Sequence, residues 1–260
     1  MNMKRLLLFW TIIMLLELQP NALAEAPGHE APYDGVWFLG FNLHASIWKG
    51  EKGLLLRKAL AASLPRVRIG EIAGASTIPD SFIPPGLSGY QNQPWPEQNF
   101  RQAKAFLQEA GLSIVDPKIK NITLLHTAGP QTVMMAKAIA KSIRHAGFGV
   151  KLQSVKGDAT EAWENALRSD EHVLFLMGYK AEREEPDSPW DAEKIIRPLF
   201  HSKGFANFTK LRDEKLDDLL SALQNDSSRV SPARIATLAH INQLLFDLLP
   251  AVPLFYIPTL

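Results

Sequence analysis

The sequence predicts an α/β fold in which a largely parallel or mixed sheet is flanked by helices. Apolar runs of strand length alternate along the chain with segments that carry apolar residues at helical spacing. Glycine and proline stand at the ends of several of these segments, where they favour turns. Strands that alternate with helices in this way are typical of one sheet covered by helices.

Five strands and seven helices are expected from these patterns. The strands are short runs of apolar and β-branched residues at 36–43, 122–127, 150–155, 173–179 and 252–257. Helical spacing of apolar residues predicts helices at 51–64, 97–110, 131–146, 159–167, 192–200, 213–224 and 232–248. Residues 70–95 are rich in Gly, Pro and Ser, which predicts a long ordered loop of the kind that often lies near a functional site.

The first 24 residues have the three parts of a cleavable secretory signal peptide. Lys4 and Arg5 give a positive start, residues 6–18 are almost entirely apolar, and Ala22-Leu23-Ala24 forms a small-x-small cleavage site. The apolar stretch is shorter than the roughly 20 residues of a transmembrane helix. An uncleaved membrane anchor is the alternative, and Glu17 within the apolar stretch favours it slightly. We therefore expect a signal peptide at 1–24, a linker at 25–35 and a periplasmic domain at 36–260.

Composition narrows the choice of partners. There is no cysteine, so the sequence excludes disulfides and a lipid anchor on cysteine. Residues 1–24 hold two of the 28 basic residues and one of the 27 acidic residues, so the rest of the chain has no net formal charge. Proteins that bind nucleic acid usually carry a clear basic excess. We expect no nucleic acid among the partners.

No motif for catalysis or for a cofactor is present. The sequence lacks a P-loop, a Gly-x-Gly-x-x-Gly fingerprint and a Gly-x-Ser-x-Gly elbow, and its seven histidines show no metal-binding spacing. We therefore expect no enzyme activity, no cofactor and no metal site. His126 is a candidate for ligand binding because it ends a strand directly before a helix, at the edge where α/β sheets bind ligands. The acidic run from Glu182 to Asp191 follows the strand at 173–179, which leaves open a site at the same edge, a solvated loop or an acid–base catalyst.

Seven segments, in order, resemble the family 5 extracytoplasmic solute-binding proteins, which are the dipeptide and oligopeptide receptors of ABC importers. The segments span nearly the whole chain after the signal peptide: Phe41-Asn42, Leu56-Arg57-Lys58-Ala59-Leu60, Ile83-Pro84-Pro85 with Gly89-Tyr90, 102–111, 122–150, Leu199-Phe200-His201-Ser202 with Gly204 and Asn207, and 250–255. The resemblance implies a periplasmic-binding-protein-like fold. It covers only the carboxy-terminal lobe of a receptor that normally has two, so we expect a single lobe.

The same resemblance implies a set of ligand-binding residues. Peptide-binding members have Gly-Trp-x-x-Asp after this strand, and its aspartate takes the α-ammonium of the peptide. Here the segment reads Gly178-Tyr179-Lys180-Ala181-Glu182, so Tyr179 would supply the aromatic wall and Glu182 the charge. Glu185 before Pro186 replaces the family's Asp-Pro, and Asn42 ends the Phe-Asn strand. Lys180 and Arg183 stand beside Glu182 and would act against its charge.

These observations favour a periplasmic solute-binding protein that serves ABC-transporter uptake of peptides or similar amine-bearing ligands. The expected partners are the ligand, an ABC permease and a second polypeptide that supplies the other lobe. One lobe offers half a pocket, whereas tight sites bury most of a small ligand. The alternative is a periplasmic interaction protein whose lobe surface docks a partner or a second copy of itself.

Overall fold

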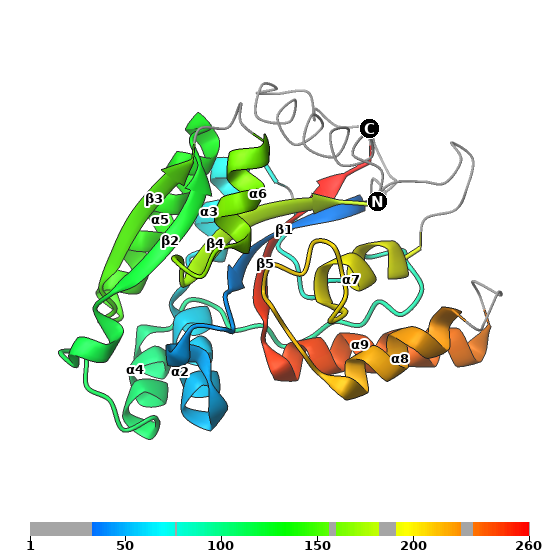
Figure 1. Ribbon diagram of the computed structural model, residues 1–260, viewed down its shortest axis with the longest axis horizontal. Helices are drawn as coiled ribbons and strands as arrows, with labels where there is room; N and C mark the ends of the chain where they lie inside the picture. The colour runs from blue at the N-terminus through cyan, green and yellow to red at the C-terminus, as the bar shows by residue number, and fades with distance from the viewer. Residues whose placement is uncertain (1–32, 76, 156–159, 182–190, 225–230, 260) are drawn as a thin grey trace.

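The computed structural model describes residues 33–75, 77–155, 160–181, 191–224 and 231–259, and Figure 1 shows these segments packed around one sheet. The sheet has five strands in the order β3-β2-β4-β1-β5. β2 pairs in parallel with β3 and β4, whereas β1 pairs antiparallel with β4 and β5. The strands are β1 (Tyr33–Phe41), β2 (Ile122–Thr127), β3 (Val150–Val155), β4 (Leu174–Lys180) and β5 (Ala251–Pro258). The predicted mixed α/β sheet is confirmed.

The strand directions define two edges of the sheet. Because β1 alone runs against the others, β2, β3, β4 and β5 all end at the same edge, where β1 begins. We call this the carboxyl edge, and it holds Thr127, Val155, Lys180, Pro258 and Tyr33. We call the other the opposite edge, where β1 ends at Phe41 and the remaining strands begin.

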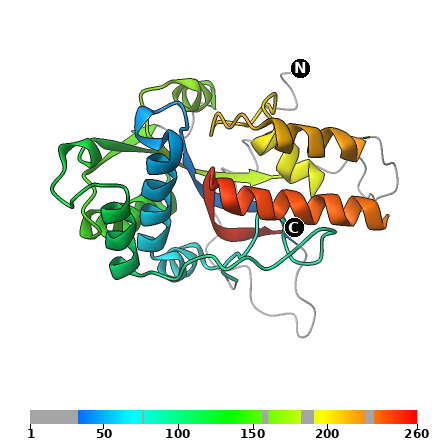
Figure 2. The same cartoon turned by 90° about the horizontal axis from the view of Figure 1, so that it is seen from below.

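Helices cover the sheet and extend beyond its opposite edge. In Figure 1, α6 lies in front of the sheet, while α3 and α5 lie behind it. Figure 2 shows α8 and α9 side by side on one side of the molecule, and α2 with α4 on the other. In the part of the chain that the structure describes, no helix combines the length and apolar character needed to cross a membrane. The helices are α2 (Gly50–Ser63), α3 (Arg66–Ala73), α4 (Phe100–Glu109), α5 (Pro130–His145), α6 (Thr160–Arg168), α7 (Glu193–Phe200), α8 (Glu214–Gln224) and α9 (Pro232–Leu248).

Two elements differ from the sequence-based expectation. β1 begins at Tyr33 rather than at residue 36, because Tyr33 and Gly35 pair with the end of β5. Helix α3 occupies residues that we expected to be irregular from position 70 onward. This helix is short, and it begins after Pro65 without a side chain that caps its first turn. The other strands and helices lie within three residues of their expected bounds.

Arg57, in the Leu56–Leu60 segment, joins the two halves of the chain. It is buried, and its guanidinium donates to the carbonyl oxygens of Leu248 and Leu249 at 3.0 Å each and to that of Trp48. The Leu248 and Leu249 carbonyls lie at the carboxyl-terminal end of α9, where orphan acceptors favour a cation. Burial lowers the pKa of Arg57 to about 10, so the side chain remains charged at neutral pH. The arginine therefore fixes α2 against the end of α9.

Candidate functional site

Tyr179 lies near the end of β4, at the carboxyl edge, and its hydroxyl contacts helix α7. The side chain is 3% exposed, and its phenol oxygen donates to the carbonyl of Lys194 at 3.2 Å. Its ring is tilted against that of Phe205, with 6.4 Å between the centroids. The contacts with Lys194 and Phe205 therefore fix the position of the Tyr179 side chain at the carboxyl edge.

Lys180 and Asp34 form an ion pair at the same edge. The lysine Nζ lies 3.1 Å from the aspartate Oδ2, and the two side chains are 12% and 1% exposed. The backbone also joins the two segments, because the Ala181 amide donates to the Asp34 carbonyl at 2.8 Å. A buried ion pair needs both partners, since removing one leaves a charge without compensation. The positive charge of Lys180 is therefore balanced by Asp34.

His126 lies at the carboxyl edge of β2 and is 3% exposed. Its Nδ1 is 2.7 Å from the Thr127 carbonyl, and since a carbonyl only accepts, Nδ1 carries the proton and Nε2 is the acceptor. Burial lowers the pKa of His126, and the Thr127 carbonyl opposes this effect. Leu125 pairs with Phe175, so His126 is level with Leu176 and roughly 10 Å along the strand from Tyr179. The two residues share an edge, and no contact joins them.

Asn42 lies at the opposite edge and is fully buried. Its Nδ2 donates to the carbonyl of His172 at 3.0 Å, and its Oδ1 accepts from the amide of His44 at 3.2 Å. Its own amide donates to the Val173 carbonyl at 3.0 Å. Asn42 thus closes the end of β1 against the start of β4. The structure does not bring it together with His126 and Tyr179.

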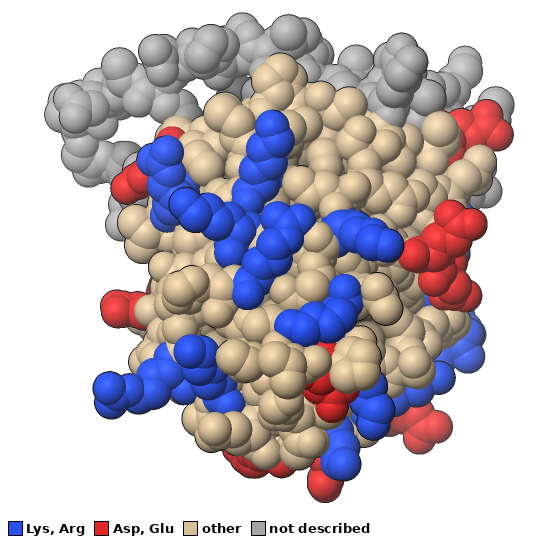
Figure 3. Space-filling model, turned by 90° about the vertical axis from the view of Figure 1, so that its left-hand side faces the viewer, with Lys and Arg blue, Asp and Glu red and all other residues tan. Residues whose placement is uncertain are grey.

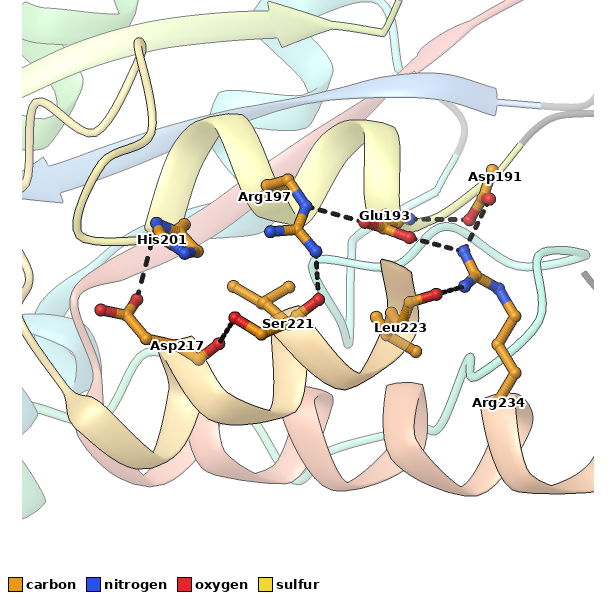
Figure 4. Close-up of polar contacts among 9 residues, drawn as sticks. Asp191, Glu193, Arg197, His201, Asp217, Ser221, Leu223 and Arg234 are labelled. Atoms are coloured by element: carbon orange, nitrogen blue, oxygen red, sulfur yellow. Dashed lines mark hydrogen bonds and ion pairs between the residues drawn. The ribbon is translucent and has the colours of Figure 1, made fainter. Parts of the chain in front are cut away.

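The acidic run is described only at its end. Glu182 and Glu185 lie outside the described residues, and so do Glu184 and Asp187. Asp191 is described, and Figure 4 shows its carboxylate beside the start of α7, facing the guanidinium of Arg234, which extends from α9. Its Oδ2 lies 2.8 Å from Arg234 Nη2, and its Oδ1 accepts from the Glu193 amide at 2.9 Å. Both carboxylate oxygens of Asp191 thus have partners, and these contacts fix the start of α7.

A cluster of tyrosines and one aspartate, which no sequence pattern marks, forms a further part of the carboxyl edge. Tyr33 and Tyr256 lie with their ring centroids 5.1 Å apart. Tyr90 donates to the Asp80 carboxylate at 2.7 Å, and Tyr256 donates to the Ser81 carbonyl at 3.0 Å. Burial raises the pKa of Tyr256, and the Asp80 and Tyr90 charges add to this effect.

This cluster orders the Pro-rich segment against the sheet. Tyr33 also contacts the hydroxyl of Thr77 at 3.1 Å, which ties the start of the segment to β1. Arg66 in α3 donates to the carbonyls of Pro253 and Pro79, and its guanidinium lies 5.8 Å from the centroid of the Trp95 ring. The only sequence signal for this cluster is the Gly, Pro and Ser content of residues 70–95, which predicts an ordered loop of the kind that often lies near a functional site. Among the described residues, no group of three or more His, Asp or Glu is placed to hold a metal ion.

A protein-family comparison matches residues 7–194 to the model described as bacterial extracellular solute-binding proteins, family 5 Middle. Solved structures with the same fold include the murein tripeptide binding protein MppA of Escherichia coli, with a TM-score of 0.71 and 20% identity. They also include DppA of Helicobacter pylori in complex with the peptide STSA, with a TM-score of 0.71 and 20% identity. NikA of Staphylococcus aureus in complex with Ni(L-His)2 has a TM-score of 0.72 and 16% identity.

The chain spans less than half the length of these structures. It aligns over 88%, 96% and 85% of its own residues with 43%, 46% and 45% of MppA, DppA and NikA, respectively. Identities this low carry the fold alone, and the ligands that these names give range from peptides to a nickel complex of histidine. A search of curated proteins found no match. The family description and the first two structures name binding proteins rather than enzymes.

Proposed function

The chain belongs to the bacterial extracellular solute-binding proteins of family 5, and from this premise we propose that it binds a peptide or a similar amine-bearing solute at the carboxyl edge of its sheet. Proteins of this family act outside the cytoplasm. The bound solute is then passed to an ABC permease for uptake. In open α/β sheets, ligands bind outside the carboxyl ends of the strands, which is where Tyr179 and His126 lie.

The Lys180–Asp34 ion pair is the observation that carries the choice of an amine. Glu182 follows Ala181 directly in the sequence, and in our proposal its carboxylate receives the ammonium group of the solute. A lysine two residues away would act against that role if its charge were free. Asp34 lies 3.1 Å from Lys180 and compensates its positive charge, so Lys180 repels an ammonium ligand at Glu182 less strongly than a free lysine would. Tyr179 would form the wall beside the ammonium group, and Glu185 would add negative charge.

The described residues form one sheet with its helices and offer only one side of the proposed site. Pockets that hold small ligands tightly bury about 70% or more of the ligand surface, and one lobe covers only one side. We propose that a second polypeptide, or a second copy of this chain, closes over the carboxyl edge. Binding by the isolated chain would then be weak.

Calorimetry of the purified protein with dipeptides and tripeptides tests the proposal. We expect binding heat with peptides that have a free amino terminus and none with the same peptides after amino-terminal acetylation, because acetylation removes the ammonium charge. Glu182→Gln should weaken binding at least about tenfold, in line with the loss of a charge-assisted hydrogen bond. Glu109→Gln, an exposed carboxylate on α4, serves as the matched control and should bind as the unchanged protein does. Equal heat with the acetylated peptides would exclude ammonium recognition.

The second candidate is an interaction protein that uses the same edge to dock a partner. The observation behind it is that the alignments cover only 43% to 46% of the three structures above. The absence of heat with every peptide, together with a stable dimer or a co-purifying protein, would favour this function over solute binding. Light scattering during gel filtration measures the oligomeric state directly.

We also propose the domain organisation that the sequence predicts. Residues 1–24 direct export and are removed, and a linker follows that is shorter than the predicted 25–35, because the fold already begins with β1 at Tyr33. The periplasmic lobe then runs from β1 to residue 260. The family's location outside the cytoplasm supports this proposal.

A further inference from the structure

Positive charge is concentrated in one part of the sequence. From Pro117 to Val155 there is no Asp or Glu, and the same stretch holds six Lys and Arg. The whole chain has a formal net charge of only +1, so this stretch is balanced by acidic residues elsewhere. A one-sided distribution of this kind bears on association rather than on folding.

The fold gathers these residues on one face of the molecule. The outward side of α5 carries Lys137, Lys141 and Arg144, all exposed and spaced by three or four residues. Figure 3 looks at this side and shows Lys and Arg side chains across its central part, with acidic side chains mainly at the margins. Among the described residues, no carboxylate forms an ion pair with any of these cations. We call this the basic face, and it consists of Lys118, Lys120, Lys137, Lys141, Arg144 and Lys151.

Hydrogen bonds hold one corner of the basic face together. Lys120 donates to the carbonyls of Ile114 and Gly147, and Arg144 Nη2 donates to the Val150 carbonyl at 2.6 Å. The Gly149 amide donates to the Ile119 carbonyl at 2.8 Å. The segment 114–120, the last turn of α5 and the start of β3 therefore form one fixed surface.

Apolar side chains project from this surface. Val115 is 75% exposed and Ile114 is 45% exposed, and they are adjacent at the fixed corner. Met134 on α5 is 52% exposed. Half of the six exposed large apolar side chains in the described residues thus belong to this one side of the molecule. Asp116, which follows Val115 in the sequence, accepts a hydrogen bond from the Lys118 amide through its carboxylate at 2.8 Å.

We propose that the basic face, with Ile114 and Val115 inserted at its corner, docks the protein on the surface of an anionic phospholipid membrane. Separate cations on an open surface suit a layer of headgroups, and adjacent exposed aliphatic side chains suit insertion among acyl chains. A protein that acts outside the cytoplasm works beside such a surface. The corner lies at the opposite edge, because α5 starts at the carboxyl edge after β2 and its last turn leads to the start of β3. Docking therefore leaves the carboxyl edge accessible.

Vesicle co-sedimentation of the exported, processed protein tests the electrostatic part. We expect binding to vesicles that contain phosphatidylglycerol, weak binding to phosphatidylcholine alone, and release as salt shortens the range of the charges. The triple variant Lys137→Gln, Lys141→Gln, Lys151→Gln should bind about 100-fold more weakly, since each basic residue contributes roughly fivefold. The matched control Lys203→Gln, Arg212→Gln, Lys215→Gln neutralises three exposed cations outside the basic face and should bind within about twofold of the unchanged protein.

A second pair of variants tests insertion. Val115→Ser should weaken vesicle binding about fivefold, because a buried aliphatic group is lost, whereas Ile235→Ser, exposed on α9, should have no effect. Equal binding to neutral and anionic vesicles, or salt-independent binding, would overturn the proposal. A second result would also overturn it: no binding to either kind of vesicle, together with a dimer at low salt that the triple variant does not form. The basic face would then bind a second copy of the chain.

Discussion

His172 is a buried histidine two residues before the start of β4, at the opposite edge. Its side chain is 1% exposed, and neither ring nitrogen makes a hydrogen bond of good geometry with the described residues. Burial and, to a smaller extent, the charge of Lys210 lower the pKa of His172 to about 4, against the opposing effects of the Ala166 backbone and Asp170. The ring is therefore neutral in the folded protein at every pH above about 5.

The pKa of His172 predicts a loss of stability in mild acid. In the unfolded chain the imidazole has an ordinary pKa of about 6.5, so it is protonated below this pH. In the folded protein the same ring becomes protonated only near pH 4, so between these two pH values the unfolded state binds one more proton than the folded state. The free energy of unfolding should fall between these two values by about 3 kcal/mol in total. His172→Leu should remove this dependence and leave stability at pH 7 equal or higher, since two unpaired polar atoms disappear.

Urea denaturation at pH 7 and pH 5 measures this effect. The matched control is His240→Leu, which changes an exposed histidine on α9 and should lose as much stability in acid as the unchanged protein. If His172→Leu and the unchanged protein lost equal stability on acidification, another group would have to be responsible.

Single residues also show where sequence reasoning stopped. Tyr179 was assigned to the ligand site through the family resemblance, and it lies near the end of β4, at the carboxyl edge. Asn42 was assigned to the same site, but it ends the one strand that runs in the opposite direction. Asp34 was missed because it stands in a segment expected to be a linker. No local pattern marks an aspartate whose partner, Lys180, is far away in the sequence.

At the scale of elements, Arg234 joins the last three helices. Its guanidinium lies 2.8 Å from Asp191 and 2.7 Å from Glu193 and donates to the Leu223 carbonyl at 2.8 Å (Figure 4). Burial alone would lower the pKa of Arg234, but the two carboxylates outweigh it and raise the pKa. Glu193 also pairs with Arg197 at 2.7 Å, so α7, α8 and α9 share one network.

Arg234→Met should destabilise the protein by about 3 kcal/mol, because Asp191 loses the guanidinium that compensates its partly buried carboxylate. Adding Asp191→Asn should recover part of this loss, since the uncompensated charge is removed. Lys215→Met, on the exposed side of α8, is the matched control and should change stability by less than about 0.5 kcal/mol. Urea denaturation of the four proteins measures the effects. A loss below about 1 kcal/mol for Arg234→Met would mean that the desolvation of the network cancels its attraction.

Elements with a clear period were predictable, and short elements without one were not. α5 has Pro130 at its start and Gly147 just past its end with φ 109°, and its predicted bounds were correct within one residue. α3 spans only eight residues, and it buries Arg66 next to Ile69, so its inner side does not look apolar in the sequence. The carbonyls of Pro253 and Pro79 that satisfy this arginine belong to other segments.

For the whole molecule, periodicity gives the number of strands but not their order. The position of β1 inside the sheet, antiparallel to both neighbours, follows from contacts with β4 and β5, which are more than 130 residues away in the sequence. That position decides which residues share the carboxyl edge. It brings Tyr33 and Asp34 to the ends of β4 and β5 and sends Asn42 to the other side. Local sequence cannot supply this information, because a strand looks the same in either direction.

At the scale of the whole chain, the signal peptide predicts export followed by cleavage after Ala24. When the protein is produced with its first 24 residues in a bacterial host, mass spectrometry of the periplasmic fraction should find Glu25 as the first residue. Ala22→Arg should block removal, because a large charged residue replaces one of the two small residues of the cleavage site, and the longer product should sediment with membranes. Leu23→Gln changes the variable middle position and should leave cleavage intact. Membrane-bound, uncleaved protein without any substitution would instead support the anchor that Glu17 favours.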